Sequence, residues 1–259
     1  MSAAHIAFLL VAGLGAGTVN AIAGGGSLIT FPALLATGLP AKAATVTNSV
    51  AVFPGYTASV YGSRTDLAEL ADSQGRRPLM WLFPTCVIGS VFGCILLLVT
   101  PSTAFEDIVP FLVIGAAVVL AFQQQLSNLV GHPRDMSPRR RTVTLHLLVG
   151  VGSVYGGYFG AALGVMLVAA LGLILDESLK RINALKNAIS AVVGLVTVLV
   201  FALYGPVDWV DVLLLAPATI VGGYVGARVA RRLPPVILRV VIVTLAFVVG
   251  IILLVKAFA

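Results

Sequence analysis

The chain contains a series of apolar segments, each about as long as a bilayer is thick. A helix needs about 20 apolar residues to cross the hydrocarbon core. Eight segments meet or approach that length, at about 4–22, 43–62, 79–99, 107–123, 142–159, 184–204, 209–227 and 236–256. Hydrophobic residues make up 59% of the 259 residues and charged residues only 10%, too few to cover a water-soluble fold. The sequence therefore predicts an all-α polytopic membrane protein.

Two further apolar pieces, at about 27–37 and 162–175, are too short to cross a bilayer unbroken. The first follows Gly24–Gly26, and the second follows the glycine-rich stretch 156–160. Short, glycine-interrupted segments at corresponding places in two halves of a membrane protein are typical of a transporter binding site. The two breaks therefore indicate where a ligand would meet the backbone.

The segments around the two breaks recur in the same order along the chain. Asn48 is followed by Gly55 seven residues later, and Asn187 is followed by Gly194 at the same spacing. This recurrence predicts two related membrane units joined by a polar, basic connection. The predicted units are a first membrane repeat at 1–123, a linker at 124–141 and a second membrane repeat at 142–259.

Each repeat makes an odd number of passes, however its short segment is placed. A short segment that crosses gives five passes, and one that forms a re-entrant hairpin with the preceding helix gives three. An odd number inverts the second repeat relative to the first and places both termini outside. Inverted repeats belong to secondary transporters, in which alternating access would rock one half against the other.

Positive charge collects in the loops of one predicted side. The formal net charge is +6, and basic residues accumulate in the cytoplasmic loops of membrane proteins. This rule assigns to the cytoplasm the loops with Arg64, Arg76 and Arg77, with Arg134 and Arg139–Arg141, and with Arg228, Arg231, Arg232 and Arg239. The linker is thus a cytoplasmic connection or, alternatively, a docking or lipid-binding patch. No basic run is interleaved with aromatic residues, so we expect no nucleic-acid partner.

Several chemistries are missing from the apolar segments. No Asp or Glu lies in the middle of a segment, which argues against a proton or Na⁺ site built on buried carboxylates. The sequence has no P-loop, no CxxC and no cluster of His and Cys. Cys86 and Cys94 are separated by ~12 Å along a helix, too far for a disulfide. We therefore expect no catalytic residues, no metal and no cofactor, and the chain is not predicted to be an enzyme.

The glycine breaks suit an anion. A helix N-terminus presents free N–H groups and the positive end of the helix dipole, and glycine lets a ligand approach the backbone. Gly24–Gly26 and Ser27 precede one short segment, and Gly160–Gly164 opens the other. Two such helix starts facing each other would cradle one small oxyanion. The alternative is helix packing, which we favour for the GxxxG pairs Gly89/Gly93, Gly156/Gly160 and Gly222/Gly226.

Polar side chains stand early in the long segment after each break. A buried asparagine must be satisfied, so Asn48 and Asn187 either hold the broken helices by hydrogen bonds or contact the substrate. Lys186 either attracts the anion or extends along the helix to the cytoplasmic edge. The candidate substrate-binding residues are Asn20, Gly24, Gly25, Gly26, Ser27, Thr47, Asn48, Ser49, Gly160, Gly164, Lys186 and Asn187.

The run from Ala16 to Gly62 resembles the TauE/SafE family of membrane proteins, often called the sulfite exporter family. The resemblance rests on Ala16-Gly17, Asn20, Ala23-Gly24-Gly25-Gly26, Leu28, Thr30, Pro32-Ala33-Leu34-Leu35 and Thr47-Asn48. In the second half, Tyr155, Gly157, Phe159 and Gly160 resemble a further family stretch. The chain has Asn20 for a frequent aspartate, Ser27 for a fourth glycine and Ser49 for a lysine.

This resemblance implies a secondary transporter that exports sulfite, an organosulfonate or a related small sulfur oxyanion from a bacterial cytoplasm. It implies a multi-pass protein of the inner membrane whose partners are the anion and membrane lipids, with self-association left open. The alternatives are a passive anion channel and a membrane enzyme subunit. The channel shares the expected fold, whereas the enzyme needs acid–base or metal-binding residues within the membrane.

Overall fold

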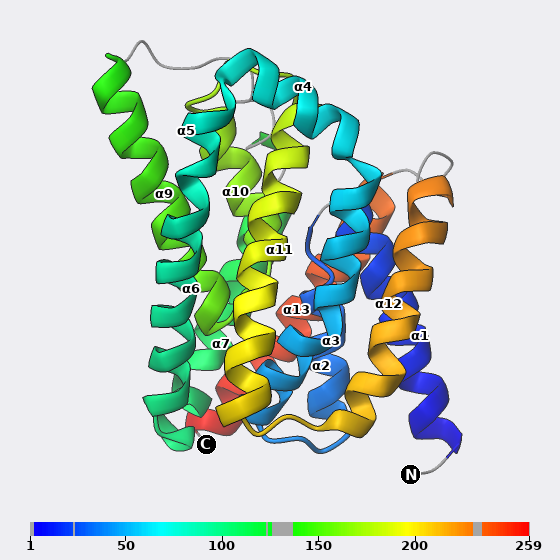
Figure 1. Cartoon of the computed structure of the whole chain (residues 1–259). Helices are drawn as coiled ribbons and strands as arrows, with labels where there is room; N and C mark the ends of the chain where they lie inside the picture. Colours follow the sequence, from blue (N-terminus) through cyan, green and yellow to red (C-terminus); the bar gives the residue numbers. More distant parts are fainter. Residues whose placement is uncertain (1–2, 23, 123, 126–136, 230–234, 259) are drawn as a thin grey trace.

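The computed structural model describes residues 3–22, 24–122, 124–125, 137–229 and 235–258, and every regular element in these ranges is helical (Figure 1). The long helices are α1 (Ala3–Ile22), α3 (Ala41–Gly62), α6 (Leu82–Val99), α7 (Ser102–Ala121), α9 (Pro138–Tyr158), α11 (Leu179–Tyr204), α12 (Trp209–Val229) and α13 (Pro235–Phe258). The short helices α2 (Ser27–Ala36) and α10 (Leu163–Gly172) follow the glycine breaks. These elements confirm the predicted all-α polytopic fold, segment by segment.

Five described stretches are long and apolar enough to cross a membrane, within α1, α5–α6, α7, α11 and α13. The helices α3 and α9 have a membrane-spanning length but a lower mean hydropathy. Many large apolar side chains of the long helices point outward, including Ile88, Phe92 and Leu199. An exposed apolar surface of this extent is stable in a bilayer and unstable in water.

The two halves contribute equivalent helices, and each of these helices packs against a helix of the other half. α1 packs along α12 of the second half, and α9 packs along α6 of the first. In the same reciprocal way, α3 packs on α11 and α7 packs on α13. In Figure 1 the chain ends lie at one end of the bundle, α1 begins there, and α9 begins at the opposite end. The equivalent helices α1 and α9 therefore run in opposite directions, as inverted repeats require.

Glycines bring these helix pairs into close contact. A Cβ added at Gly17 would collide with the carbonyl oxygen of Thr219, and one at Gly93 would collide with that of Val154. A Cβ at Gly89 would lie 2.8 Å from the carbonyl oxygen of Gly150. The packing role favoured for Gly89 and Gly93 is confirmed, since these positions leave no space for a side chain.

Helices α4 (Arg64–Gln74) and α5 (Arg76–Met80) occupy the stretch that we expected to be a basic loop. They lie at the end of the bundle where α9 and α11 begin (Figure 1). Hydropathy does not reveal α4 because it is short and polar, yet its Leu70 side chain is fully buried. The predicted linker at 124–141 lies mostly outside the described residues, and α9 already begins within it at Pro138.

Glu177 fastens α4 to the start of α11. Its carboxylate accepts hydrogen bonds from Ser73 Oγ at 2.5 Å, Gln74 Nε2 at 2.7 Å and the Arg181 guanidinium at 3.0 Å. Arg181 also pairs with Glu69 of α4 at 3.1 Å. Burial acts to raise the pKa of Glu177, but these donors outweigh it and hold the pKa below its ordinary value of 4.5.

This arrangement predicts a pH-dependent stability for the wild-type protein. Since the folded-state pKa of Glu177 is lowered, its stabilising effect is complete above pH 4.5 and is lost as the pH falls through the folded-state value. The Glu177→Gln variant should unfold several degrees lower than wild type in detergent at pH 7, and the two melting curves should converge in acid. An equal difference at every pH would contradict the role given to the carboxylate.

Candidate substrate pocket

The two glycine breaks share one backbone geometry. Gly24 and Gly160 adopt φ angles of 77° and 73°, a region that favours glycine because a side chain is strained there. The N–H of each glycine donates to the carbonyl oxygen five residues earlier, at 3.1 Å and 3.0 Å. In both halves the next helix begins three residues later, at Ser27 and Leu163. The breaks are therefore structural counterparts, as their sequence positions predicted.

The breaks of the two halves also lie against each other. A Cβ added at Gly24 would lie 3.0 Å from the Cα of Gly164, and the reverse addition would be equally close. Nearby, Phe31 of α2 and Phe159 form an edge-to-face pair with ring centroids 5.3 Å apart. This crossing brings the start of α2 and the start of α10 to the same place in the bundle.

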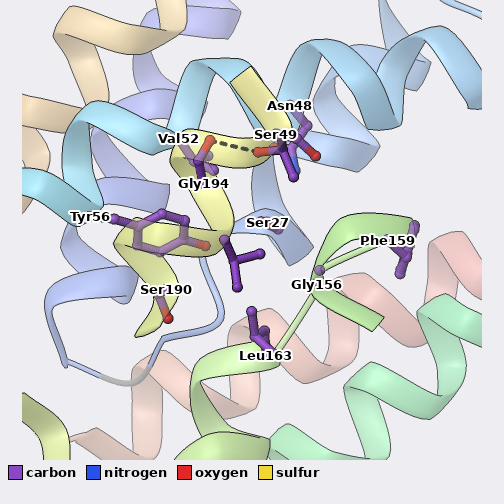
Figure 2. A pocket seen from close by; sticks show the side chains of 13 residues that line it. Ser27, Asn48, Ser49, Val52, Tyr56, Gly156, Phe159, Leu163, Ser190 and Gly194 are labelled. Atoms are coloured by element: carbon purple, nitrogen blue, oxygen red, sulfur yellow. Dashed lines mark hydrogen bonds between the residues drawn. The ribbon is translucent and has the colours of Figure 1, made fainter. Parts of the chain in front are cut away.

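A pocket lies where these two helix starts meet α3 and α11. It holds about 320 Å³ of space free of protein atoms, part of it open to the surroundings. Figure 2 shows Tyr56 of α3, Ser27 of α2 and Leu163 of α10 around this space. The lining residues are Ser27, Asn48, Ser49, Val52, Tyr56, Gly156, Phe159, Gly160, Leu163, Ser190, Val193, Gly194 and Thr197.

The polar part of the lining consists of hydroxyl groups and one amide. Tyr56 and Ser27 share a hydrogen bond, and Ser49 and Thr197 donate to backbone carbonyls of their own helices at 2.9 Å and 2.8 Å. Ser190 is only 2% exposed and makes no hydrogen bond to any residue that the structure describes. A buried hydroxyl facing a pocket without a protein partner can donate to a ligand.

Four of the predicted site residues line the pocket, namely Ser27, Asn48, Ser49 and Gly160. The Asn48 side chain is also tied to α2, because its Oδ1 accepts a short hydrogen bond from Thr30. Asn48 therefore braces the broken segment and also lines the pocket, and its contact with a substrate stays a prediction.

Four further predicted residues belong to the first break but not to the lining. Asn20 Oδ1 accepts from the N–H of Gly26 at 2.8 Å and so caps the start of α2. A Cβ at Gly26 would collide with the Ala16 carbonyl oxygen, and one at Gly25 would meet the Leu120 side chain at 3.3 Å. Together with Gly24, these residues fix the conformation of the break before α2.

Thr47 and Asn187 point away from the pocket. Thr47 Oγ1 accepts from the N–H of Asp208 at 2.9 Å, which ties α3 to the loop before α12. Asn187 Nδ2 donates to Ser63 Oγ at 3.2 Å and so joins α11 to the end of α3. Both residues brace helices where we expected them either to brace or to bind.

Lys186 and Gly164 lie together just beyond the lining. A Cβ added at Gly164 would be 3.1 Å from Cδ of Lys186, so the lysine stem runs beside the first turn of α10. Only 6% of Lys186 is exposed. The Lys186 side chain is therefore buried, whereas Lys180 of the same helix is exposed.

Sequence reasoning did not single out Tyr56, Ser190 or Thr197. A signal for them was present, because lining residues recur every three or four positions along α3 and α11, as they do on one face of a helix. Extending the pattern from Ser49 through Val52 leads to Tyr56. The same face of α11 carries Ser190, Val193 or Gly194, and Thr197.

Comparison with known proteins places the chain among membrane transporters. The sequence model of the sulfite exporter TauE/SafE family matches residues 9–253. A probable membrane transporter protein of Haemophilus influenzae is 28% identical over 93% of this chain and 91% of its own length. A second probable membrane transporter protein, of Sinorhizobium, is 27% identical over 96% of this chain and 92% of its own length. The probable membrane transporter protein YfcA of Escherichia coli is 28% identical over 84% of this chain and 76% of its own length.

No solved structure matches the chain. The family match covers almost the entire sequence, including both glycine breaks and all the residues that line the pocket. The fold and these relatives agree on a multi-pass membrane transporter. The chain belongs to the sulfite exporter TauE/SafE family.

Proposed function

We propose that this protein is a secondary transporter that exports a small sulfur oxyanion, such as sulfite or an organosulfonate, and binds it in the pocket at Ser27, Asn48 and Ser190. One observation carries the proposal. The starts of two broken-off helices, one from each half, converge on a single pocket lined by hydroxyl groups. Transporters of inverted-repeat architecture bind their substrates at such broken helices.

The chemistry of the pocket suits an oxyanion. The α2 and α10 starts direct the positive ends of their dipoles to this region, which favours negative charge. Hydroxyl groups donate hydrogen bonds to oxyanion oxygens without leaving a permanent charge in the membrane. No acidic side chain belongs to the described lining, so nothing there repels an anion. The family name supplies the choice of sulfur oxyanions.

Alternating access requires two bodies that move against each other. α1, α3 and α12 pack together in one group, α6, α9 and α11 pack together in another, and α3 packs on α11 where the two groups meet. Each group takes helices from both halves. The pocket lies between α3 and α11, one from each group. We therefore assign the rocking motion to these groups rather than to 1–123 against 142–259.

The orientation follows from charge. Arg64, Arg76 and Arg77 lie in α4 and α5, and Arg139–Arg141 lie in the first turn of α9, at the same end of the bundle (Figure 1). Because basic residues collect on the cytoplasmic side of membrane proteins, we propose that this end and the central linker lie in the cytoplasm and both termini outside. Export in a bacterial inner membrane then runs from the α4 end to the opposite end.

Counterflow in proteoliposomes tests this function. Vesicles containing purified protein are preloaded with unlabelled methanesulfonate or sulfite and diluted into labelled anion, beside protein-free vesicles. A carrier gives transient accumulation of label that depends on the preloaded anion. Equilibration without that dependence would indicate a channel, and no uptake of any sulfur oxyanion would refute the proposed substrate class.

A further inference from the structure

Lys186 is a buried lysine with no counter-charge among the described residues. It is only 6% exposed, and it forms neither a hydrogen bond nor an ion pair with any residue in the described ranges. The ion pairs of the described carboxylates involve His5, Arg76 and Arg181 instead. A buried ammonium is costly unless it is paired, so an unpartnered one in a folded protein calls for an explanation.

The surroundings of Lys186 add to its positive charge. Its stem lies beside Gly164, in the first turn of α10, where the helix dipole is positive. Gly24 of the other break lies against the same glycine. A cation placed at the positive end of a helix is unfavourable by itself. An anion bound between the lysine and the start of α10 would be attracted by both, so both interactions would be favourable.

The position of Lys186 on α11 relates it to the pocket. Lys186, Ser190 and Gly194 are spaced four residues apart and so share one face of the helix, and the latter two line the pocket. Lys186 is one turn, ~6 Å, from Ser190 toward the start of α11. That start lies at the same end of the bundle as α4 (Figure 1), so Lys186 lies on the cytoplasmic side of the pocket in the proposed orientation.

We infer that Lys186 provides the charged subsite of the pocket and pairs with the oxyanion group of the substrate as it arrives from the cytoplasmic side. This inference rests on the proposed function, since it names the group that recognises the charge of the transported anion. The hydroxyl groups around Ser190 recognise shape and hydrogen bonding, and Lys186 distinguishes an anion from a neutral molecule of the same shape. A hydroxyl-lined pocket alone would make that distinction only weakly.

Ligand-induced thermal stabilisation of the purified protein in detergent tests the inference without requiring transport. The probes are methanesulfonate, the neutral and similarly shaped methanesulfonamide, and chloride. Wild type should be stabilised by methanesulfonate and not by the sulfonamide. In Lys186→Met and Lys186→Gln the apparent affinity for methanesulfonate should fall about 10- to 100-fold. Lys186→Arg should retain most of the binding, because it keeps the charge.

Lys180→Gln is the matched control, because it removes a positive charge from an exposed position on the same helix. It should bind methanesulfonate as wild type does. The unliganded Lys186→Met protein should melt no lower than wild type, since an unpaired buried charge has been removed. If methanesulfonate stabilised Lys186→Met as much as wild type, the inference would be overturned. It would also be overturned if chloride were the only anion that stabilised wild type, or if neither anion did. Binding that depends on Lys186 without counterflow would refute the transport function instead.

Discussion

Replacing Gly26 with alanine should strongly destabilise the protein. The added Cβ would collide with the carbonyl oxygen of Ala16 and would lie 2.8 Å from the Asn20 amide. Neither neighbour can give way, because one is helix backbone and the other accepts the hydrogen bond that caps α2. Overpacking of this kind costs about 1–3 kcal/mol or more, which lowers the melting temperature by roughly 5–10 °C.

Thermal unfolding in detergent measures this effect, with Gly25→Ala as the matched control. A Cβ at Gly25 would meet only the Leu120 side chain, at 3.3 Å, and a side chain can shift where backbone cannot. Gly25→Ala should therefore melt within a few degrees of wild type. If Gly26→Ala melted together with Gly25→Ala, the close packing of α1 on the start of α2 would not be what holds the break.

Replacing Ser190 with leucine should block transport while leaving the fold intact. The hydroxyl of Ser190 has no partner among the described residues, so its loss leaves no protein group unsatisfied. The larger side chain enters the pocket rather than a packed core, and it displaces the substrate. This steric exclusion should lower the apparent affinity for the substrate about 10- to 100-fold, which corresponds to about 1.4–2.8 kcal/mol of binding free energy.

Counterflow of methanesulfonate measures this effect, and Leu195→Phe is the control because Leu195 lies on the same helix with its side chain exposed on the outer surface. Leu195→Phe should transport as wild type does. Ser190→Leu should show little exchange but unchanged expression and melting temperature. Wild-type exchange by Ser190→Leu would remove the pocket from the transport path, whatever the substrate.

Hydropathy was sufficient to predict most of the fold. A segment that must satisfy all its backbone groups within a bilayer becomes a helix, so the apolar segments and the elements α1 to α13 correspond closely. The breaks were predictable as well, because Gly24 and Gly160 stand three residues before their short helices. The helix α4 was not, because its stability comes from burying Leu70 and from the bonds of Glu177, which are contacts between distant segments.

The candidate site was only partly predictable from the sequence. Ser27, Asn48, Ser49 and Gly160 line the pocket as expected. Thr47 and Asn187 are polar, as many pocket residues are, but they bond to the loop before α12 and to the end of α3, and these contacts depend on how the helices pack. The burial of Lys186 likewise depends on Gly164, a residue 22 positions away in the sequence.

The measurement that tests the account most directly is the two-sided accessibility of the pocket. Cys86 and Cys94 are replaced by alanine, Ser190 is replaced by cysteine, and a membrane-impermeant maleimide is applied from either face of sealed, oriented vesicles, with and without methanesulfonate. Alternating access to an anion site predicts labelling from both faces and protection by methanesulfonate but not by methanesulfonamide. Labelling that is absent from both faces, or that the anion leaves unchanged, would contradict the assignment of this pocket as the transport site.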